Sequence, residues 1–190
     1  MPSTRFRLIL KTAAATLALA GLAGAIGGFV VLRAGLYDTS ASAQHLQPVF
    51  TLLEQGMRYS VRNHSSEVKV PPLGASQQVK QGALVYSAHC AQCHGGPAFA
   101  QAKIGQSMQP LPGPLIDASA RWQPRELYWI TKHGIKMSGM PAWQFHLSES
   151  DLWAVVAFMQ VLPTLSARDY AEATRAGPVA APSAAAGATR

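Results

Sequence analysis

The pattern of apolar and polar residues divides the chain into an apolar N-terminal segment, an amphipathic stretch, a compact region and a tail. Near the N-terminus, residues 12–32 form a run of 21 residues that carries no charge. A helix of about 20 apolar residues spans the hydrocarbon core of a bilayer. Residues 1–43 are therefore predicted to contain a transmembrane anchor.

The charges beside the apolar run predict its orientation. Arg5, Arg7 and Lys11 precede the run, whereas Arg33 is the one basic residue that closely follows it. Because basic flanks are retained in the cytoplasm, the N-terminus is predicted to stay there. The rest of the chain would then face the periplasm, as the domain of a single-pass protein of a bacterial inner membrane.

A cleaved signal peptide is the alternative to an anchor. Ala41-Ser42-Ala43 fits a small-residue cleavage site of the A-x-A type. The apolar run is nevertheless longer than the apolar part of a signal peptide, which has about 7–15 residues, and the candidate site lies well beyond the end of the run. An uncleaved anchor is preferred, and both interpretations predict the same compartment.

Residues 44–78 are predicted to form an amphipathic helix and a linker. Within residues 46–62, apolar and small residues recur at helical spacing. They make one stripe, which consists of Val49, Leu52, Leu53, Gly56, Met57 and Val61. This pattern predicts a helix that lies near the membrane or against the following domain. Pro71-Pro72 then stops any helix.

Residues 79–163 are predicted to be an all-α domain of short helices and long loops. Helical patterns cover residues 79–88, the segment from Pro124 to His133, and a segment that begins at Ser148 and ends before Pro163. The last of these helices has a predicted apolar face of Leu152, Val155, Val156, Met159 and Leu162. No stretch shows the alternation that is typical of a strand.

Composition separates this domain from the tail and excludes one class of partner. Residues 164–190 are mostly Ala, Pro, Gly and Thr, so they are predicted to be disordered for lack of apolar surface to bury. Of the net charge of +7, residues 79–163 contribute only +2, since they contain six basic and four acidic residues. Because no basic block is present, no nucleic-acid partner is expected.

The two cysteines of the chain belong to one motif, Cys90-Ala91-Gln92-Cys93-His94. C-x-x-C-H is the attachment motif of a c-type haem. Two thiols on one helical turn can add to the vinyl groups at one edge of the porphyrin, and His94 then lies under the iron as an axial ligand. The alternatives are a structural disulfide, a thioredoxin-like redox pair and half of a zinc site. The last two lack the βαβ pattern or the second ligand pair that they require.

Methionines further along the chain are candidates for the second axial ligand of the iron. Met137 and Met140 lie in a stretch rich in Gly and Pro, where an apolar stripe does not account for them. A thioether ligand raises the reduction potential relative to a second histidine. Met108, in the long irregular loop between Gly95 and Pro114, is a weaker candidate.

The C-x-x-C-H motif and the later Gly139-Met140-Pro141-Ala142-Trp143 together resemble the class I cytochrome c family, in particular its small membrane-anchored bacterial members. The resemblance covers residues 79–163. It implies one covalently bound haem c, attached through Cys90 and Cys93, with His94 and Met140 as axial ligands. Met137 is the reserve ligand and is expected to be a packing or edge residue.

The resemblance also implies two contacts around the haem motif. A small residue, Gly82, is expected to let the last helix cross the first one closely, with Phe158 or Val155 as its neighbour. A carbonyl group in the Gly96-Pro97 turn is expected to accept the ring N–H of His94, which would fix the tautomer of that histidine.

The predicted function is that of a one-electron carrier in a periplasmic respiratory chain, and not of an enzyme. Two protein ligands leave the iron no position for a small-molecule substrate. The expected partners are redox proteins, with a dehydrogenase or quinol oxidase as donor and a terminal oxidase as acceptor. One alternative is a haem subunit of a larger membrane dehydrogenase or oxidase complex. Another is a haem enzyme or gas sensor, which requires that neither Met140 nor Met137 holds the iron, or that the bound methionine leaves easily.

Overall fold

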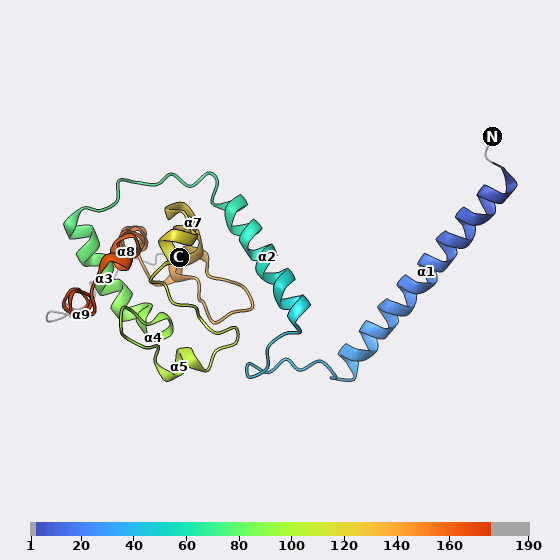
Figure 1. Ribbon diagram of the computed structural model, residues 1–190, viewed down its shortest axis with the longest axis horizontal. Coiled ribbons are helices and arrows are strands. Elements are labelled where there is room, and N and C mark those ends of the chain that lie inside the picture. The colour runs from blue at the N-terminus through green and yellow to red at the C-terminus, as the bar shows by residue number, and fades with distance from the viewer. Residues whose placement is uncertain (1–2, 176–190) are drawn as a thin grey trace, which may run out of the picture. The chain divides into compact units, whose positions relative to one another are not determined.

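The computed structural model describes residues 3–175, and within this range every regular element is a helix, so the predicted all-α class is confirmed. Residues 1–43 and 44–190 form separate units. The elements are α1 Thr4–Arg33, α2 Gln47–His64, α3 Ser76–His89, α4 Ala91–His94, α5 Lys103–Gln106, α6 Ala118–Arg121, α7 Pro124–His133, η1 Trp143–Phe145, α8 Glu149–Val161, η2 Leu162–Thr164 and α9 Ala167–Ala173 (Figure 1).

The core of the second unit is the packing of α3 against α8. Gly82 makes the close approach possible, because a methyl group at this position would overlap the Ala154 carbonyl oxygen and lie 2.8 Å from the Phe158 Cβ. The predicted neighbour Phe158 is thus confirmed, and Ala154 takes the place expected for Val155. The five apolar residues predicted along the last helix, from Leu152 to Leu162, are all buried.

The boundaries of α7 and α8 follow the predicted capping residues. Pro124 is the first residue of α7, and Gly134, with a φ of 68°, directly follows its last residue. The hydroxyl of Ser148 accepts the backbone N–H of Asp151 at the start of α8. Between the two helices, the rings of Tyr128 and Trp153 stack 4.0 Å apart. This stacking contributes to the packing of α7 against α8.

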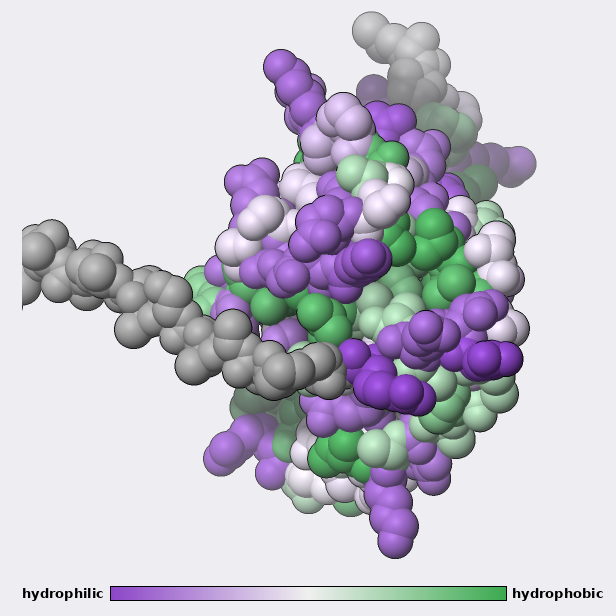
Figure 2. Space-filling model, turned by 90° about the vertical axis from the view of Figure 1, so that its left-hand side faces the viewer, coloured by the Kyte–Doolittle hydropathy of each residue, from purple (hydrophilic) through white to green (hydrophobic). Residues whose placement is uncertain are grey.

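Residues 164–175 correct the prediction of a disordered tail. Thr164 is the last residue of η2, and the segment then forms α9, whose Tyr170 is only 4% exposed and packs beside Tyr86 and Phe158. The Ala- and Pro-rich composition of the whole tail did not indicate that Tyr170 is a core residue. The rest of the predicted tail, residues 176–190, lies outside the described residues. Figure 2 shows polar and apolar side chains interspersed over the face of the molecule that lies on the left in Figure 1.

Helix α2 packs on α7 through only part of the predicted apolar stripe. Val61 is 1% exposed and Met57 is half-buried, whereas Leu52 is 71% exposed. The predicted helix is confirmed, and only part of its apolar stripe packs against the domain. The residues that contact the domain lie on a different side of α2 from Val49, Leu52 and Leu53, which leaves a second apolar surface uncovered.

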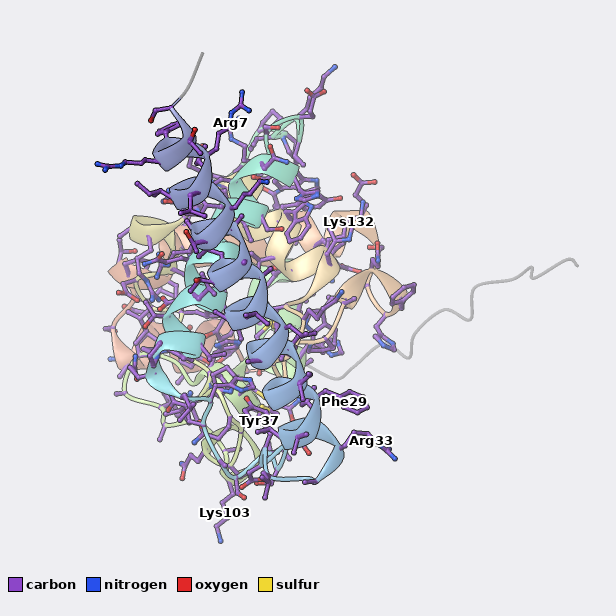
Figure 3. All side chains as sticks on the ribbon, turned by 90° about the vertical axis from the view of Figure 1, so that its right-hand side faces the viewer. Arg7, Phe29, Arg33, Tyr37, Lys103 and Lys132 are labelled. Atoms are coloured by element: carbon purple, nitrogen blue, oxygen red, sulfur yellow. The ribbon has the colours of Figure 1, made fainter. Side chains whose placement is uncertain are left out.

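Helix α1 is long and apolar enough to cross a membrane. It has 30 residues, and none of its side chains is buried within the described part of the chain. Figure 3 shows Arg7 and Arg33 near opposite ends of α1, with Phe29 pointing away from the helix. A hydrophobic helix with basic residues at both ends fits either a membrane anchor or a signal sequence.

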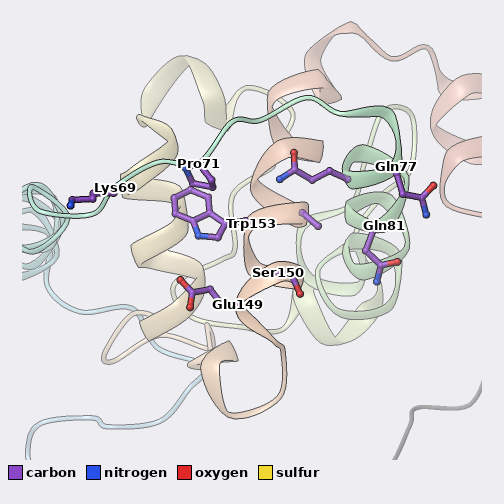
Figure 4. A pocket seen from close by; sticks show the side chains of 9 residues that line it. Lys69, Pro71, Gln77, Gln81, Glu149, Ser150 and Trp153 are labelled. Atoms are coloured by element: carbon purple, nitrogen blue, oxygen red, sulfur yellow. The ribbon is translucent and has the colours of Figure 1, made fainter.

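The linker between α2 and α3 runs across the start of α8. Pro71 lies beside the indole ring of Trp153, and a shallow groove opens between this linker, α3 and α8 (Figure 4). The groove is lined mostly by amide and other polar side chains, including Gln77 and Gln81. It contains none of the predicted haem ligands, so the candidate site lies elsewhere.

Candidate haem-binding site

The predicted attachment motif forms a single helical turn at the end of α3. Cys90 lies between α3 and α4 as the cap residue of both, and its carbonyl oxygen accepts the N–H groups of Cys93 and His94 at 3.0 and 2.9 Å. The Cys90 N–H in turn donates to the Tyr86 carbonyl at 2.9 Å. The structure therefore brings Cys90, Cys93 and His94 together on one rigid turn, as the motif predicts.

The state of the two thiols argues against the alternatives to haem attachment. Cys90 and Cys93 are free of a disulfide, and burial raises the pKa of the Cys90 thiol to about 12. A thioredoxin-like pair requires a cysteine with a lowered pKa. Within residues 3–175, no group of three His, Cys, Asp or Glu side chains is arranged to hold a metal ion, which removes support for a zinc site.

The ring of His94 is fixed by one hydrogen bond. Its Nδ1–H donates to the Gly113 carbonyl oxygen at 2.7 Å. Burial lowers the pKa of His94 despite this bond, so the ring is neutral at neutral pH and its Nε2 carries the free lone pair. The acceptor is not in the Gly96-Pro97 turn, so that prediction is wrong. The actual acceptor lies 19 residues along the chain.

The carbonyl group that receives His94 is held in place by its neighbours. The Gln101 side-chain amide donates to the Pro112 carbonyl, and the Arg121 guanidinium donates to the Pro114 carbonyl at 2.9 Å. Three consecutive carbonyl groups, those of residues 112–114, thus accept from three separate side chains. Sequence reasoning missed Gly113, although a glycine between two prolines was a signal for a rigid turn.

Tyr86 and Tyr170 hold the turn that follows His94. The Tyr86 hydroxyl donates to the Gly95 carbonyl oxygen at 2.8 Å, and burial raises the pKa of Tyr86 far above its ordinary value, so the hydroxyl stays a donor. The ring of Tyr170 lies so close to Gly96 that a Cβ there would overlap it. Helix α9 therefore packs on the attachment turn and holds it in place, a contact that the sequence did not predict.

We expect replacement of Tyr170 by Ala to lower the free energy of unfolding by about 3–5 kcal/mol, because it removes a buried aromatic ring and leaves a cavity. Tyr170→Phe keeps the ring and should cost less than about 1.5 kcal/mol. Guanidinium unfolding of the haem-loaded protein, followed by tryptophan fluorescence, measures both values. Equal stability of the Ala variant and the unchanged protein would show that α9 does not hold the turn.

Met140 lies on a short loop between α7 and η1. The Ile135 N–H donates to the Met140 carbonyl at 3.2 Å, and the Met140 N–H donates to the Ser138 hydroxyl at 3.1 Å. These bonds fix the backbone on both sides of the Met140 side chain, which is half-buried. Met137 lies in the turn of the same loop, with a φ of 60° and 61% exposure.

Contacts through Met108 connect the attachment turn with the Met140 loop. Helix α5 packs on the turn, since a Cβ at Gly105 would lie 2.8 Å from the Cys93 Cα. Two residues after α5, the Met108 thioether packs on Gly139, where a Cβ would lie 2.6 Å from its sulfur. Met108, the weaker ligand candidate, thus packs against the loop that carries Met140.

The groups on this turn and this loop fit a c-type haem. Two unpaired thiols lie on one turn beside a neutral imidazole with a free Nε2, and a thioether lies on a loop with a fixed backbone. Covalent haem requires thiols of this spacing, and haem iron accepts imidazole and thioether ligands. The donor set therefore meets the chemical requirements of the group.

Comparison with known proteins agrees with this interpretation. The family model described as cytochrome c oxidase, cbb3-type, subunit III matches residues 77–159. No curated protein and no solved structure matches the chain. The matched segment runs from the first turn of α3 nearly to the end of α8, and it includes the C-x-x-C-H turn and the Met140 loop. Residues 77–159 of this chain are a cytochrome c domain of the class I type, and its family implies haem c and electron transfer.

Proposed function

We propose that this protein is a membrane-anchored monohaem cytochrome c that carries single electrons in a periplasmic respiratory chain. The observation that carries the proposal is the C-x-x-C-H turn, on which the Nδ1–H of His94 is held by the Gly113 carbonyl. In this proposal Cys90 and Cys93 bind the haem covalently, and His94 and Met140 are its axial ligands. The bound haem supplies the exchange of one electron between ferric and ferrous iron.

The chain's own residues would tune this exchange. The hydrogen bond to Gly113 makes His94 a stronger electron donor and fixes its orientation. The bonds of Ile135 and Ser138 to the backbone of Met140 hold the loop in one conformation. A small structural change between redox states favours fast electron transfer. By holding the ligands in place, these local bonds would keep that change small. The proposed donor is a dehydrogenase or quinol oxidase, and the proposed acceptor is a terminal oxidase.

The proposed anchor is α1, with the domain on the periplasmic side of a bacterial inner membrane. The length and hydropathy of α1 and its basic flanks support this placement. An anchored carrier diffuses only in the plane of the membrane, which keeps it close to membrane-bound redox enzymes.

A second candidate function is that of a haem subunit fixed in a larger membrane oxidase complex. The description of the matched family, a subunit III of a cbb3-type oxidase, favours it. Purification in mild detergent separates the two proposals. A tight subunit elutes with other chains at fixed stoichiometry, whereas a carrier elutes alone.

We expect Met140→Ala to keep the covalent haem but to lower the reduction potential and to let carbon monoxide bind the ferrous iron. Loss of the thioether opens an axial position, and the remaining histidine stabilises the ferric state relatively more. Redox titration and the visible spectrum under carbon monoxide measure both effects.

Met137→Ala and Met108→Ala are the matched controls for this substitution. Neither should open the iron to carbon monoxide if Met140 is the ligand. Carbon monoxide binding to the unchanged protein would instead point to a haem enzyme or gas sensor. Binding to the Met137 variant alone would assign the ligand to Met137.

A further inference from the structure

The charged residues of α2 lie on the side that faces the domain. Arg58 lies over the ring of Trp122, with 5.4 Å between its guanidinium carbon and the ring centre, and pairs with Glu54 at 2.9 Å. Arg62 lies 3.9 Å from the buried carboxylate of Glu126. Together with the buried Val61, these residues make the surface by which α2 packs on the domain. Glu54, Arg58 and Arg62, the three charged residues of α2, therefore all make contacts on or beside the side that faces the domain.

The opposite side of α2 is uncharged and mostly apolar. Successive residues of a helix are about 100° apart. One arc of α2 therefore contains five apolar or small residues, which we call the outer arc: Val49, Leu52, Leu53, Gly56 and Tyr59. Two polar residues, Ser60 and Asn63, lie between them on the same arc. Leu52 is 71% exposed and Tyr59 is 70% exposed, and a Cβ at Gly56 would meet nothing within 4 Å. This arrangement reverses the usual surface helix, whose charged residues face water.

We propose that the outer arc of α2 rests on the surface of a phospholipid bilayer, the same membrane that α1 crosses. The inference rests on the proposed function in one respect, since it requires α1 to act as an anchor. It adds a second point of membrane contact, which would set how the haem domain is oriented above the bilayer. The other possible occupants of the arc are a second copy of the chain and a helix of another protein.

The short connection to α1 favours the bilayer. α1 ends at Arg33 and α2 begins at Gln47, so 13 residues lie between them. Such a segment reaches at most about 45 Å when fully extended. With α1 in the membrane, the start of α2 therefore stays close to the bilayer surface, and a weak affinity is sufficient because the effective concentration of lipid is high.

The composition and the size of the arc also favour lipid. Leucine side chains beside a tyrosine suit the boundary between acyl chains and head groups, where tyrosine is enriched. A stable interface between two proteins uses about 20–30 residues on each side. The outer arc offers five, which are too few for a dimer by themselves but enough for tethered contact with a membrane.

Site-directed labelling of the full haem-loaded chain in vesicles tests this proposal. Single cysteines replace Leu52 or Tyr59 on the outer arc, and an environment-sensitive fluorophore is attached to each. Thr51→Cys is the matched control, because Thr51 is an exposed residue of the same helix outside the arc. Lys80→Cys, on α3, is a control away from α2. Vesicles of phosphatidylethanolamine and phosphatidylglycerol serve as the membrane.

We expect the fluorescence of labels at positions 52 and 59 to shift to the blue in vesicles and to be quenched by lipid-bound quenchers. Labels at 51 and 80 should keep the spectrum of a label in water. Equal, water-like spectra at all four positions would overturn the proposal. A blue shift at 52 and 59 without quenching from the lipid would also overturn it and would indicate contact with protein.

Flotation of the same vesicles separates this inference from the proposed function. If the chain does not float with the vesicles, the anchor itself fails. If it floats and the outer arc remains in contact with water, α1 is an anchor and only the inference about α2 fails. The visible spectrum of each labelled variant shows that its haem domain is folded.

Discussion

Replacement of Cys90 and Cys93 by Ala is expected to abolish covalent haem completely. Each thiol supplies one thioether bond, and no other cysteine exists in the chain to replace them. After extraction with acidified acetone, the unchanged protein should keep its colour, whereas the double variant should lose all of it to the solvent. Colour that stays with the double variant would contradict the proposed attachment.

The single variants refine this prediction. Cys90 is buried at the end of α3, whereas Cys93 is half-buried and packs beside Gly105. Either variant should keep one thioether bond and retain colour after extraction. The difference in haem yield between them measures how strongly the rigid end of α3 positions the first thiol.

Substitution of Gly82 by Ala is expected to be the most destabilising single methyl group that can be added to the helical core. The new Cβ would overlap the Ala154 carbonyl oxygen, a backbone atom that can move only if α8 moves. We expect a loss of about 3 kcal/mol, at the upper end of the usual cost of overpacking. Chemical unfolding of the haem-loaded protein measures the change.

Gly56→Ala is the matched control, because Gly56 is also inside a helix but has open space around it. There the substitution should stabilise the protein by up to about 1 kcal/mol, since alanine is the better helix former. Opposite signs at the two glycines would confirm that the α3–α8 contact, and not helix propensity, determines the effect. A neutral Gly82 variant would show that the two helices can separate freely.

Local signals in the sequence predicted the longer helices and the attachment turn, but not the short helices α5, α6 and α9. Pro124, Gly134 and Ser148 lie at the predicted helix boundaries, because the caps of a helix depend on a few adjacent residues. The haem motif likewise lies within five consecutive residues. The ligand role of Met140 stays a prediction, and the structure adds the backbone bonds that hold its loop.

Contacts between distant segments were beyond this reasoning. The predicted acceptor for His94 lies in the adjacent Gly96-Pro97 turn. In the structure, the loop that follows this turn folds back, and the Gly113 carbonyl oxygen accepts the bond instead. Tyr170 was missed because the average composition of the tail hides one well-placed aromatic ring. Periodicity identified α2 as amphipathic, but it could not show that two different sides of the helix have different environments.

The two proposed axial ligands differ in how widely their supports are spread along the chain. His94 is tied to Gly113, whose neighbours are tied to Gln101 and Arg121. The backbone of Met140 is held by Ile135 and Ser138 of its own loop and packs on the adjacent Gly134, while Met108 packs on Gly139. A loop closed on itself can open as a small unit at low free energy while the rest of the core stays folded. We therefore expect the Met140 loop to open before the His94 turn under mild denaturing stress, so that the proposed thioether ligand would leave the iron before the proposed histidine ligand does.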